Sequence, residues 1–366
     1  MPGSWASRLP AFPWDSLLEA KETAGRHPGG LVDLSIGTPV DRVPHAVRAA
    51  LAAHSDFPGY PTTQGTLALR QSYSRWLSRT HEVPDLDPAA VLPTIGSKEL
   101  VAGLPFQLGL GATDTVAIPE LAYPTYEVGV RLAGCQLVRT DHPLQSGSTH
   151  LSLLWLNSPS NPTGAVLSAE QLRKIVIWAR ANNTIVASDE CYIDLGWDAS
   201  PVSILNPAVS GGNHTGLLAL HSLSKRSNLA GYRIGFVSGD PSLIDQLLQV
   251  RKHMGLMMPG PMQAAAIAAL DDDGHVMAER SRYSQRRTVL TDALTEAGFQ
   301  IDHSEAGLYL WCTRGKDAEA TVSWFADRGI LVASGAFYGP DGASHVRVSL
   351  TAADERVAAA AERLSG

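Results

Sequence analysis

The sequence predicts an α/β protein with a mostly parallel central sheet flanked by helices, plus a smaller α+β domain. Up to about residue 255, short apolar runs alternate with longer segments of helical period, which is the pattern of βαβ units. Beyond that point, a long helical stretch is followed by short mixed elements. We therefore predict a large α/β domain over residues 37–275 and a smaller α+β domain formed by residues 1–36 and 276–366.

Eight apolar runs are the expected strands of the first part of the chain. They are residues 31–37, 91–96, 115–120, 135–140, 151–157, 184–190, 216–222 and 233–239. A helix is expected over 168–183, because Ser168 can cap its first turn and Glu170 lies within that turn. Residues 263–298 are expected to form one long helix. After it we expect a helix around 318–327, two apolar runs and a terminal amphipathic helix.

Composition and cysteine usage narrow the class of protein. The formal net charge of −7 disfavours a nucleic-acid partner, which would favour basic patches. The three cysteines are far apart and show no metal-binding spacing, so we expect a reducing compartment and no metal. The N-terminus lacks a secretory signal, and no run of about 20 apolar residues occurs, so a cytoplasmic protein without a membrane span is expected.

The stretch SLSKRSNLAGYRIGF, residues 222–236, carries the clearest chemical signal. A lone lysine in a loop is usually a solvated surface residue, but Lys225 follows an apolar run and has Ser222 and Ser224 beside it. Arg233, eight positions later, offers a planar fork of donors that suits a phosphate. A lysine can form a Schiff base with a carbonyl compound. An amine among phosphate-binding groups points to pyridoxal 5'-phosphate as the cofactor.

Two further motifs follow predicted strands and could serve the ring of that cofactor. In SDECY, Asp189 stands at a strand end and could face a protonated ring nitrogen, although such a residue can also be a simple cap. Tyr192 could reach the phenolic oxygen, or be a core aromatic. In NSPSNPTG, Asn161 could donate its amide to the same oxygen, or belong only to a turn.

Two segments supply candidates for the phosphate and for the face of the ring. PTIGSKEL places Ser97 and Lys98 where a strand gives way to a helix, and the free N–H groups of a helix N-terminus suit a phosphate. An ordinary helix cap is the alternative. PELAYPTYE supplies Tyr123, which could stack on a flat ring or take part in packing.

Together the motifs NPTG, DExY, SxSK followed by GxRxG, and a late RVS resemble those of the class I and II aminotransferases, which are fold-type I pyridoxal-phosphate enzymes. The resemblance runs from about residue 31 to the end. It implies that Lys225 holds the cofactor, that Asp189 faces the pyridine nitrogen and that Tyr123 stacks on the ring. The phenolic oxygen would be bound by Asn161 and Tyr192, and the phosphate by Ser97, Lys98 (through its backbone), Ser222, Ser224 and Arg233.

The resemblance also implies a substrate site and an assembly. Arg347, in HVRVSLT, would grip the α-carboxylate of the substrate. Gly37 would let that carboxylate approach closely, with Asn161 nearby. Tyr60, in GYPTTQGTLALR, would reach the phosphate of a neighbouring subunit, which implies a homodimer with the active site at the interface.

Within the family, the chain most resembles the actinobacterial N-succinyldiaminopimelate aminotransferases of lysine and diaminopimelate synthesis. This implies N-succinyl-LL-2,6-diaminopimelate and glutamate as the amino pair and 2-oxoglutarate as the acceptor. An aspartate or aromatic aminotransferase, or a carbon–sulfur β-lyase of the same fold, is the alternative. A cofactor-binding regulatory module is disfavoured, because only about 30 residues precede DLSIG and the chain is acidic.

Overall fold

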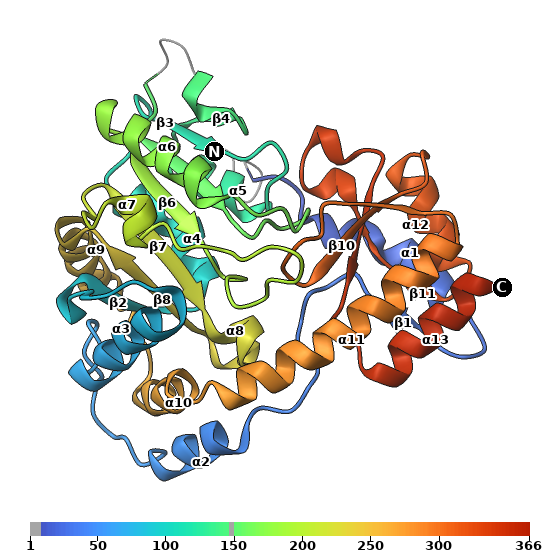
Figure 1. The fold of residues 1–366 in the computed structure, drawn as a ribbon, viewed down its shortest axis with the longest axis horizontal. Helices are drawn as coiled ribbons and strands as arrows, with labels where there is room; N and C mark the ends of the chain where they lie inside the picture. The colour runs from blue at the N-terminus through green and yellow to red at the C-terminus, as the bar shows by residue number, and fades with distance from the viewer. Residues whose placement is uncertain (1–8, 146–149) are drawn as a thin grey trace, which may run out of the picture.

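The computed structural model describes residues 9–145 and 150–366, and its centre is a seven-stranded sheet (Figure 1). The sheet is parallel except for β8, which runs antiparallel to both its neighbours. The predicted mostly parallel sheet is therefore confirmed. The strands, in spatial order, are β2 (Val91–Ile95), β8 (Ile234–Gly239), β7 (Leu217–Ser222), β6 (Ile185–Asp189), β5 (Leu153–Asn157), β3 (Thr115–Ile118) and β4 (Gln136–Arg139).

Helices cover both faces of this sheet. One face packs against α4 (Ser97–Gln107), α5 (Thr125–Ala133) and α9 (Pro241–Met254). The other packs against α3 (Leu67–His81), α6 (Ala169–Ala181) and α10 (Gly260–Leu270), while the short α7 (Pro207–Ser210) contacts α6. Within β5, Leu153 and Trp155 face the first layer and Leu154 and Leu156 the second. Because both faces are buried, the strands read as continuous apolar runs rather than alternating ones.

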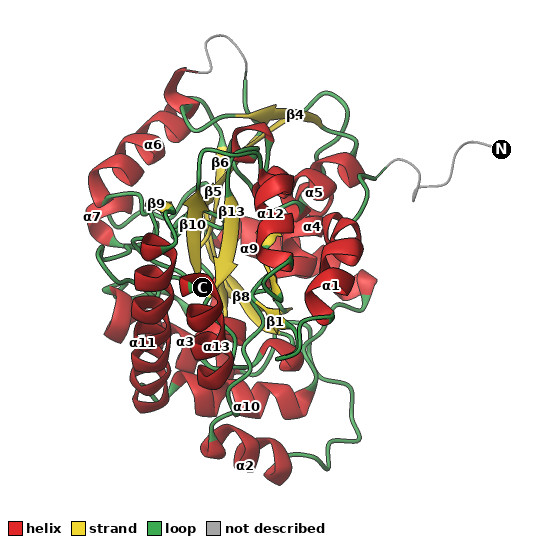
Figure 2. Cartoon of the chain, turned by 90° about the vertical axis from the view of Figure 1, so that its right-hand side faces the viewer, coloured by secondary structure: helices red, strands yellow, loops and turns green. Residues whose placement is uncertain are grey.

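A second sheet forms with the C-terminal part of the chain. It is antiparallel, with the order β12 (Ala333–Ser334), β13 (Val346–Ser349), β10 (Tyr309–Thr313) and β9 (Gln300–Asp302). Figure 2 shows α11 (Gly274–Glu296) and α13 (Asp354–Ser365) side by side near this sheet. A third helix, α12 (Ala318–Ala326), packs against α1 (Leu18–Gly25) from the N-terminal segment.

The run predicted as a strand over 31–37 contributes only two residues of strand. This is β1 (Val32–Asp33), which pairs in parallel with β11 (Ile330–Leu331), outside the seven-stranded sheet. From there the chain passes through α2 (His45–Ala53), which packs on α10. The N-terminal segment thus joins the C-terminal elements, while the domain boundaries proposed at residues 37 and 275 stay a prediction.

The single long helix predicted over 263–298 is wrong, because α10 and α11 are separated at Asp271–Asp273. Two of these three acidic residues bind side chains of α3. Asp271 accepts a hydrogen bond from the Ser72 hydroxyl at 2.7 Å, and Asp273 forms an ion pair with Arg79 at 2.6 Å. Contacts to α3, far away in the sequence, therefore favour a break over continued helix.

The predicted cap of α6 is confirmed. The Ser168 side chain accepts a hydrogen bond from the backbone N–H of Gln171, and the Gln171 side chain accepts one from the Ser168 N–H. This reciprocal pair satisfies two donors that the helix itself cannot bind. No helix within residues 9–145 and 150–366 is long and apolar enough to cross a membrane.

Candidate active site

A cavity of about 260 Å³ lies between the carboxyl edge of the seven-stranded sheet and the second sheet. All the residues expected to bind cofactor or substrate line it, except Tyr60, whose side chain is 97% exposed in this chain. The predicted residues that line the cavity are Gly37, Ser97, Lys98, Tyr123, Asn161, Asp189, Tyr192, Ser222, Ser224, Lys225, Arg233 and Arg347.

The strands explain why residues so far apart in sequence meet here. Asn157, Asp189 and Ser222 are the last residues of β5, β6 and β7. Asn157 and Asp189 lie in register on neighbouring parallel strands. In an open α/β sheet, the carboxyl ends of parallel strands lie at one edge, and ligands bind beyond that edge. Arg347 reaches the same space from β13 in the second sheet.

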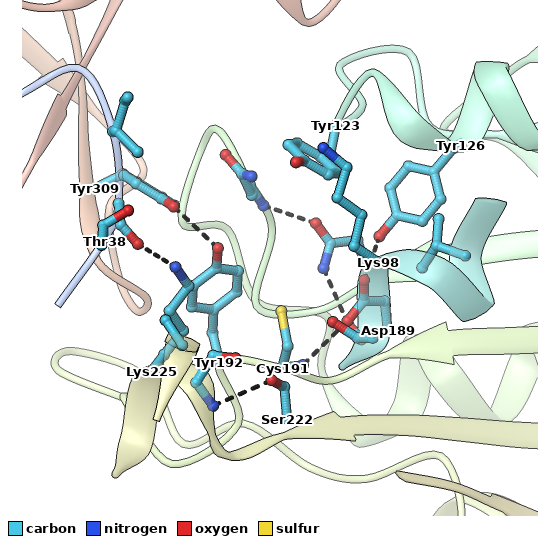
Figure 3. A pocket seen from close by; sticks show the side chains of 18 of the residues that line it. Thr38, Lys98, Tyr123, Tyr126, Asp189, Cys191, Tyr192, Ser222, Lys225 and Tyr309 are labelled. Atoms are coloured by element: carbon cyan, nitrogen blue, oxygen red, sulfur yellow. Dashed lines mark hydrogen bonds between the residues drawn. The ribbon is translucent and has the colours of Figure 1, made fainter. Parts of the chain in front are cut away.

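Asp189 is a buried carboxylate whose hydrogen bonds come from neutral donors. The Tyr126 hydroxyl donates to Oδ2 at 2.8 Å, and the Cys191 backbone N–H donates to Oδ1 at 3.2 Å (Figure 3). Burial raises the pKa of Asp189, although these hydrogen bonds oppose the shift. Ionised Asp189 is therefore costly in this chain. A cationic group facing it from the cavity would offset that cost.

Several hydrogen-bond donors also line the cavity. Helix α4 begins at Ser97, directly after Gly96, so its first N–H groups are free for an anion. Ser222 and Ser224 stand at the start of the short helix α8 (Leu223–Arg226). Arg233 has a left-handed backbone conformation with φ of 56°, which is uncommon for a residue with a side chain. Of the seven described non-glycine residues with positive φ, Arg233 is the one that lines the cavity.

Gly96 offers a test of this donor cluster. Its φ is +73°, and a Cβ there would lie 2.4 Å from Nη2 of Arg233. Gly96→Ala should lower the free energy of unfolding by about 1–2 kcal/mol through backbone strain. It should also displace the guanidinium and weaken cofactor binding, which titration of the apoprotein would measure.

Gly109→Ala is the matched control for this variant. Gly109 has a similar φ of +76°, but apart from its two chain neighbours no described residue has an atom within 4 Å of the added Cβ. Both variants should lose stability, and only Gly96→Ala should lose cofactor affinity. Equal affinity in the two variants would contradict a phosphate site formed by α4 and Arg233.

Lys225 lies in α8 and is half-buried. Its Nζ donates a hydrogen bond to the backbone carbonyl of Gly37, in the loop that follows β1 (Figure 3). The amine therefore points into the cavity from the large sheet and meets the N-terminal segment there. A short helix following a buried strand holds it in this place.

Arg347 is buried with its guanidinium facing the cavity. Its Nη1 donates to Oδ1 of Asn161 at 2.8 Å, and its Nη2 donates to the backbone carbonyl of Ser35 at 2.7 Å. Both partners are neutral. A substrate carboxylate could accept two parallel hydrogen bonds from such a planar fork, and these charge-assisted bonds would be stronger than the neutral ones.

Sequence reasoning missed several residues that line the cavity. Tyr126 and Asn157 stand inside the quoted motifs PELAYPTYE and NSPSNPTG, so position within a motif is a usable signal for them. Trp14 had no such signal, since it comes from the N-terminal segment. The missed lining residues are Trp14, Ile36, Thr38, Val101, Tyr126, Asn157, Cys191, Ala230 and Tyr309.

The residues present suit pyridoxal phosphate. The cavity offers a lysine amine, a buried carboxylate whose hydrogen bonds within the described part of the chain come from neutral donors, and donors for a phosphate at a helix N-terminus. Tyr123 adds an aromatic wall. Within residues 9–145 and 150–366, no group of three or more His, Cys, Asp or Glu side chains is placed to hold a metal ion.

Comparison with known proteins agrees with this chemistry. Residues 30–364 match the family model of the class I and II aminotransferases, so the chain belongs to that family. Members of this family are pyridoxal-phosphate enzymes that transfer amino groups between amino acids and keto acids. A solved aminotransferase from Neisseria meningitidis Z2491 superposes with a TM-score of 0.89 at 29% identity, covering 98% of this chain and 97% of that one.

Three curated relatives are similar to this chain over most of its length. A probable aminotransferase of Mycobacterium tuberculosis is 59% identical over 99% of this chain and 87% of its own length. The 4-dedimethylamino-4-oxo-anhydrotetracycline transaminase of Streptomyces rimosus is 57% identical over 98% of this chain and 99% of its own. An LL-diaminopimelate aminotransferase of Dehalococcoides mccartyi is 30% identical over 92% and 91%.

Proposed function

We propose that the protein transfers the amino group of N-succinyl-LL-2,6-diaminopimelate to 2-oxoglutarate, forming glutamate. The observation that carries amino transfer on an α-amino acid is that Lys225, Asp189 and Arg347 line one cavity. The finer substrate is supported by the resemblance of several sequence stretches to the N-succinyldiaminopimelate enzymes. The 30% identical relative named for LL-diaminopimelate supports a substrate of this general shape.

The bound cofactor supplies a carbonyl carbon that takes up the amino group and a ring that withdraws electrons from the substrate Cα. Lys225 would hold the cofactor through its amine, and the same amine, when free, would take the proton from the substrate Cα. Asp189 keeps the ring nitrogen protonated, because the ion pair offsets the burial of its carboxylate. Tyr192 and Asn161 donate to the phenolic oxygen.

The remaining residues bind and orient. The phosphate is held by the N–H groups of Ser97 and Lys98 and by the side chains of Ser97, Ser222, Ser224 and Arg233, while Tyr123 stacks on the ring. Arg347 exchanges its two neutral partners for the α-carboxylate of the substrate. With both ends of the reacting amino acid held, its Cα is placed beside Lys225, and this orientation contributes to the rate.

Tyr60 is the basis for a proposed homodimer with the active site at the interface. The side chain is 97% exposed in a single chain, and Phe57 in the same segment is 45% exposed. An isologous two-fold dimer is the commonest way to cover such a surface. In this arrangement Tyr60 of the partner subunit contacts the phosphate.

Mixing two inactive variants tests the shared site. Lys225→Ala and Tyr60→Ala subunits, unfolded and refolded together, should regain activity that neither has alone, because a mixed dimer has one site with both native residues. Sedimentation would establish the dimer. No gain on mixing, or an active monomer at working concentration, would contradict the shared site.

The substrate proposal predicts a ranking among amino donors. N-succinyl-LL-2,6-diaminopimelate should have the highest kcat/KM, and unsuccinylated diaminopimelate should be poor, since it offers an ammonium where an acyl group is expected. Two-substrate plots should give the parallel lines of a ping-pong mechanism. The succinyldiaminopimelate assignment is wrong if kcat/KM for aspartate or an aromatic amino acid is tenfold higher, which corresponds to about 1.4 kcal/mol. It is also wrong if cystathionine yields pyruvate and ammonia.

A second candidate substrate belongs in the same panel. The 57% identical relative is named for a ketone on an anhydrotetracycline ring, so this chain could aminate a cyclic ketone. Arg347→Lys distinguishes the two when each half-reaction is measured separately, because a loss confined to the α-amino acid half-reaction, with amination of the cyclic ketone unchanged, indicates recognition through a carboxylate. We also propose a cytoplasmic location without nucleic-acid or membrane partners, supported by the acidic composition and by cysteines that are all free.

A further inference from the structure

Tyr309 lies between two groups to which the proposed function gives separate tasks. Its side chain comes from β10 and is buried. Its hydroxyl is 3.0 Å from the hydroxyl of Tyr192, and the two rings meet edge to face with centroids 5.7 Å apart. The guanidinium carbon of Arg347 lies 3.9 Å from the centre of the Tyr309 ring, within the range of a cation–π contact.

Gly37 shows how closely the Tyr309 hydroxyl is fitted. A Cβ at Gly37 would lie 2.1 Å from that oxygen, so any larger residue would displace the tyrosine. The carbonyl of the same Gly37 accepts the hydrogen bond from Lys225 Nζ. In Figure 3 the side chains of Tyr309, Tyr192 and Lys225 gather around this loop. The Tyr309 hydroxyl is therefore part of the reacting end of the cavity.

The number of hydroxyl protons on Tyr192 and Tyr309 determines which of the two donates the hydrogen bond between them. Each phenol has one proton to donate. When Tyr192 donates its proton into the cavity, the hydrogen bond between the tyrosines requires Tyr309 to donate to the Tyr192 oxygen. Hydrogen bonds in such a chain polarise one another, so this arrangement makes Tyr192 a stronger donor. Burial raises the pKa of Tyr192 well above its ordinary value, which keeps the phenol protonated.

We propose that Tyr309 is a positioning residue that couples the carboxylate-binding guanidinium of Arg347, through its ring, to the hydrogen-bond donor Tyr192, through its hydroxyl. This inference rests on the proposed function, because it needs Arg347 and Tyr192 in their proposed roles. Its physical content is that one side chain fixes both groups relative to each other, although Arg347 lies in β13 of the second sheet and Tyr192 in the turn that follows β6 of the first.

Tyr309→Phe removes the hydroxyl and keeps the ring against Arg347. Tyr338→Phe is the matched control, since Tyr338 is also buried and its ring centre lies 5.1 Å from the Arg347 guanidinium carbon. Among residues 9–145 and 150–366, the Tyr338 hydroxyl has no hydrogen-bond partner. The pH midpoint of the visible absorption of the cofactor-loaded protein should rise by about half a pH unit in Tyr309→Phe, because the donor to the phenolic oxygen is weakened. The midpoint of Tyr338→Phe should equal that of the wild type.

Kinetics and a double variant complete the test. Tyr309→Phe should lower kcat about threefold with little change in KM for the amino donor, whereas Tyr309→Leu should also raise KM. In a Tyr192→Phe background, Tyr309→Phe should no longer move the midpoint. Equal midpoints for Tyr309→Phe and Tyr338→Phe, or additive shifts in the double variant, would overturn the inference. If Tyr192→Phe and Arg347→Lys themselves change neither spectrum nor KM, the proposed function fails instead.

Discussion

Lys225→Ala is expected to abolish amino transfer and the visible absorption of the holoenzyme together. The alanine removes both the covalent attachment of the cofactor and the group that moves the proton at the substrate Cα. General acid–base catalysis alone contributes about 10²–10⁴-fold, and the loss of attachment adds to this. The fold should survive, since Lys225 is only half-buried and its hydrogen bond reaches a loop carbonyl. Far-ultraviolet circular dichroism and a kinetic assay measure the two effects.

Borohydride reduction followed by peptide mapping identifies the attachment site directly. Lys98 is the informative comparison, because its side chain lines the same cavity. Its ammonium lies 5.6 Å from the centre of the Tyr123 ring. The reduced cofactor should be found on the peptide that contains Lys225. Label on Lys98 or on any other lysine would contradict the assignment, whatever the activity of the alanine variant.

Asp189→Asn is expected to lower turnover by orders of magnitude while making the apoprotein more stable. Burial raises the pKa of Asp189 in the folded state above its value in the unfolded chain. The folded protein therefore binds the Asp189 proton more tightly than the unfolded chain does. The stabilisation that this proton gives the folded state is present at low pH and is lost as pH rises through the folded-state pKa. At neutral pH the ionised carboxylate destabilises the apoprotein, and a neutral amide removes that cost.

Chemical unfolding as a function of pH tests this prediction. The apo-form of Asp189→Asn should match the wild type in acid and exceed it toward neutral pH, and added cofactor should stabilise the wild type more than the variant. If apo-Asp189→Asn is less stable than the wild type at pH 7, or if its turnover is near normal, Asp189 is a strand cap and not the partner of a ring nitrogen.

Asp194→Asn is the matched control, and its expected effect on stability at neutral pH has the opposite sign. Asp194 lies 3.1 Å from both Arg226 Nε and His81 Nε2. Burial by itself raises the pKa of Asp194. The charges of Arg226 and His81 outweigh this effect and hold the pKa at about 2. Its contribution to stability is present above the unfolded pKa and is lost as pH falls toward 2. Asp194→Asn should therefore destabilise the protein at neutral pH, by about 3 kcal/mol for a broken buried pair.

Much of the central sheet and most of the candidate site could be predicted from sequence, because both depend on local patterns. Strands buried on both faces are continuous apolar runs, and seven of the eight expected runs form the central sheet. The motif residues follow those runs directly. Since parallel strands end at one edge, Asn161, Asp189 and Lys225 could be placed together without knowing the strand order.

Features that depend on contacts between distant segments could not be predicted. At the break between α10 and α11, Asp271 and Asp273 bind Ser72 and Arg79 of α3, nearly two hundred residues earlier in the chain. Tyr309 gave no chemical signal of its own, because an apolar strand that carries a tyrosine is ordinary core. Its importance arises from where β10 meets the loop at Gly37.

Local sequence patterns were enough to predict the alternating elements, the place of Lys225 among hydroxyl and guanidinium donors and the aspartate at a strand end, because propensity and motif spacing act over a few residues. The packing of distant segments is what brings Tyr126 to Asp189, Trp14 to the cavity and Tyr309 to both Arg347 and Tyr192. Those contacts close loops of tens to hundreds of residues. They are selected by the packing of two sheets against each other, which no local pattern encodes.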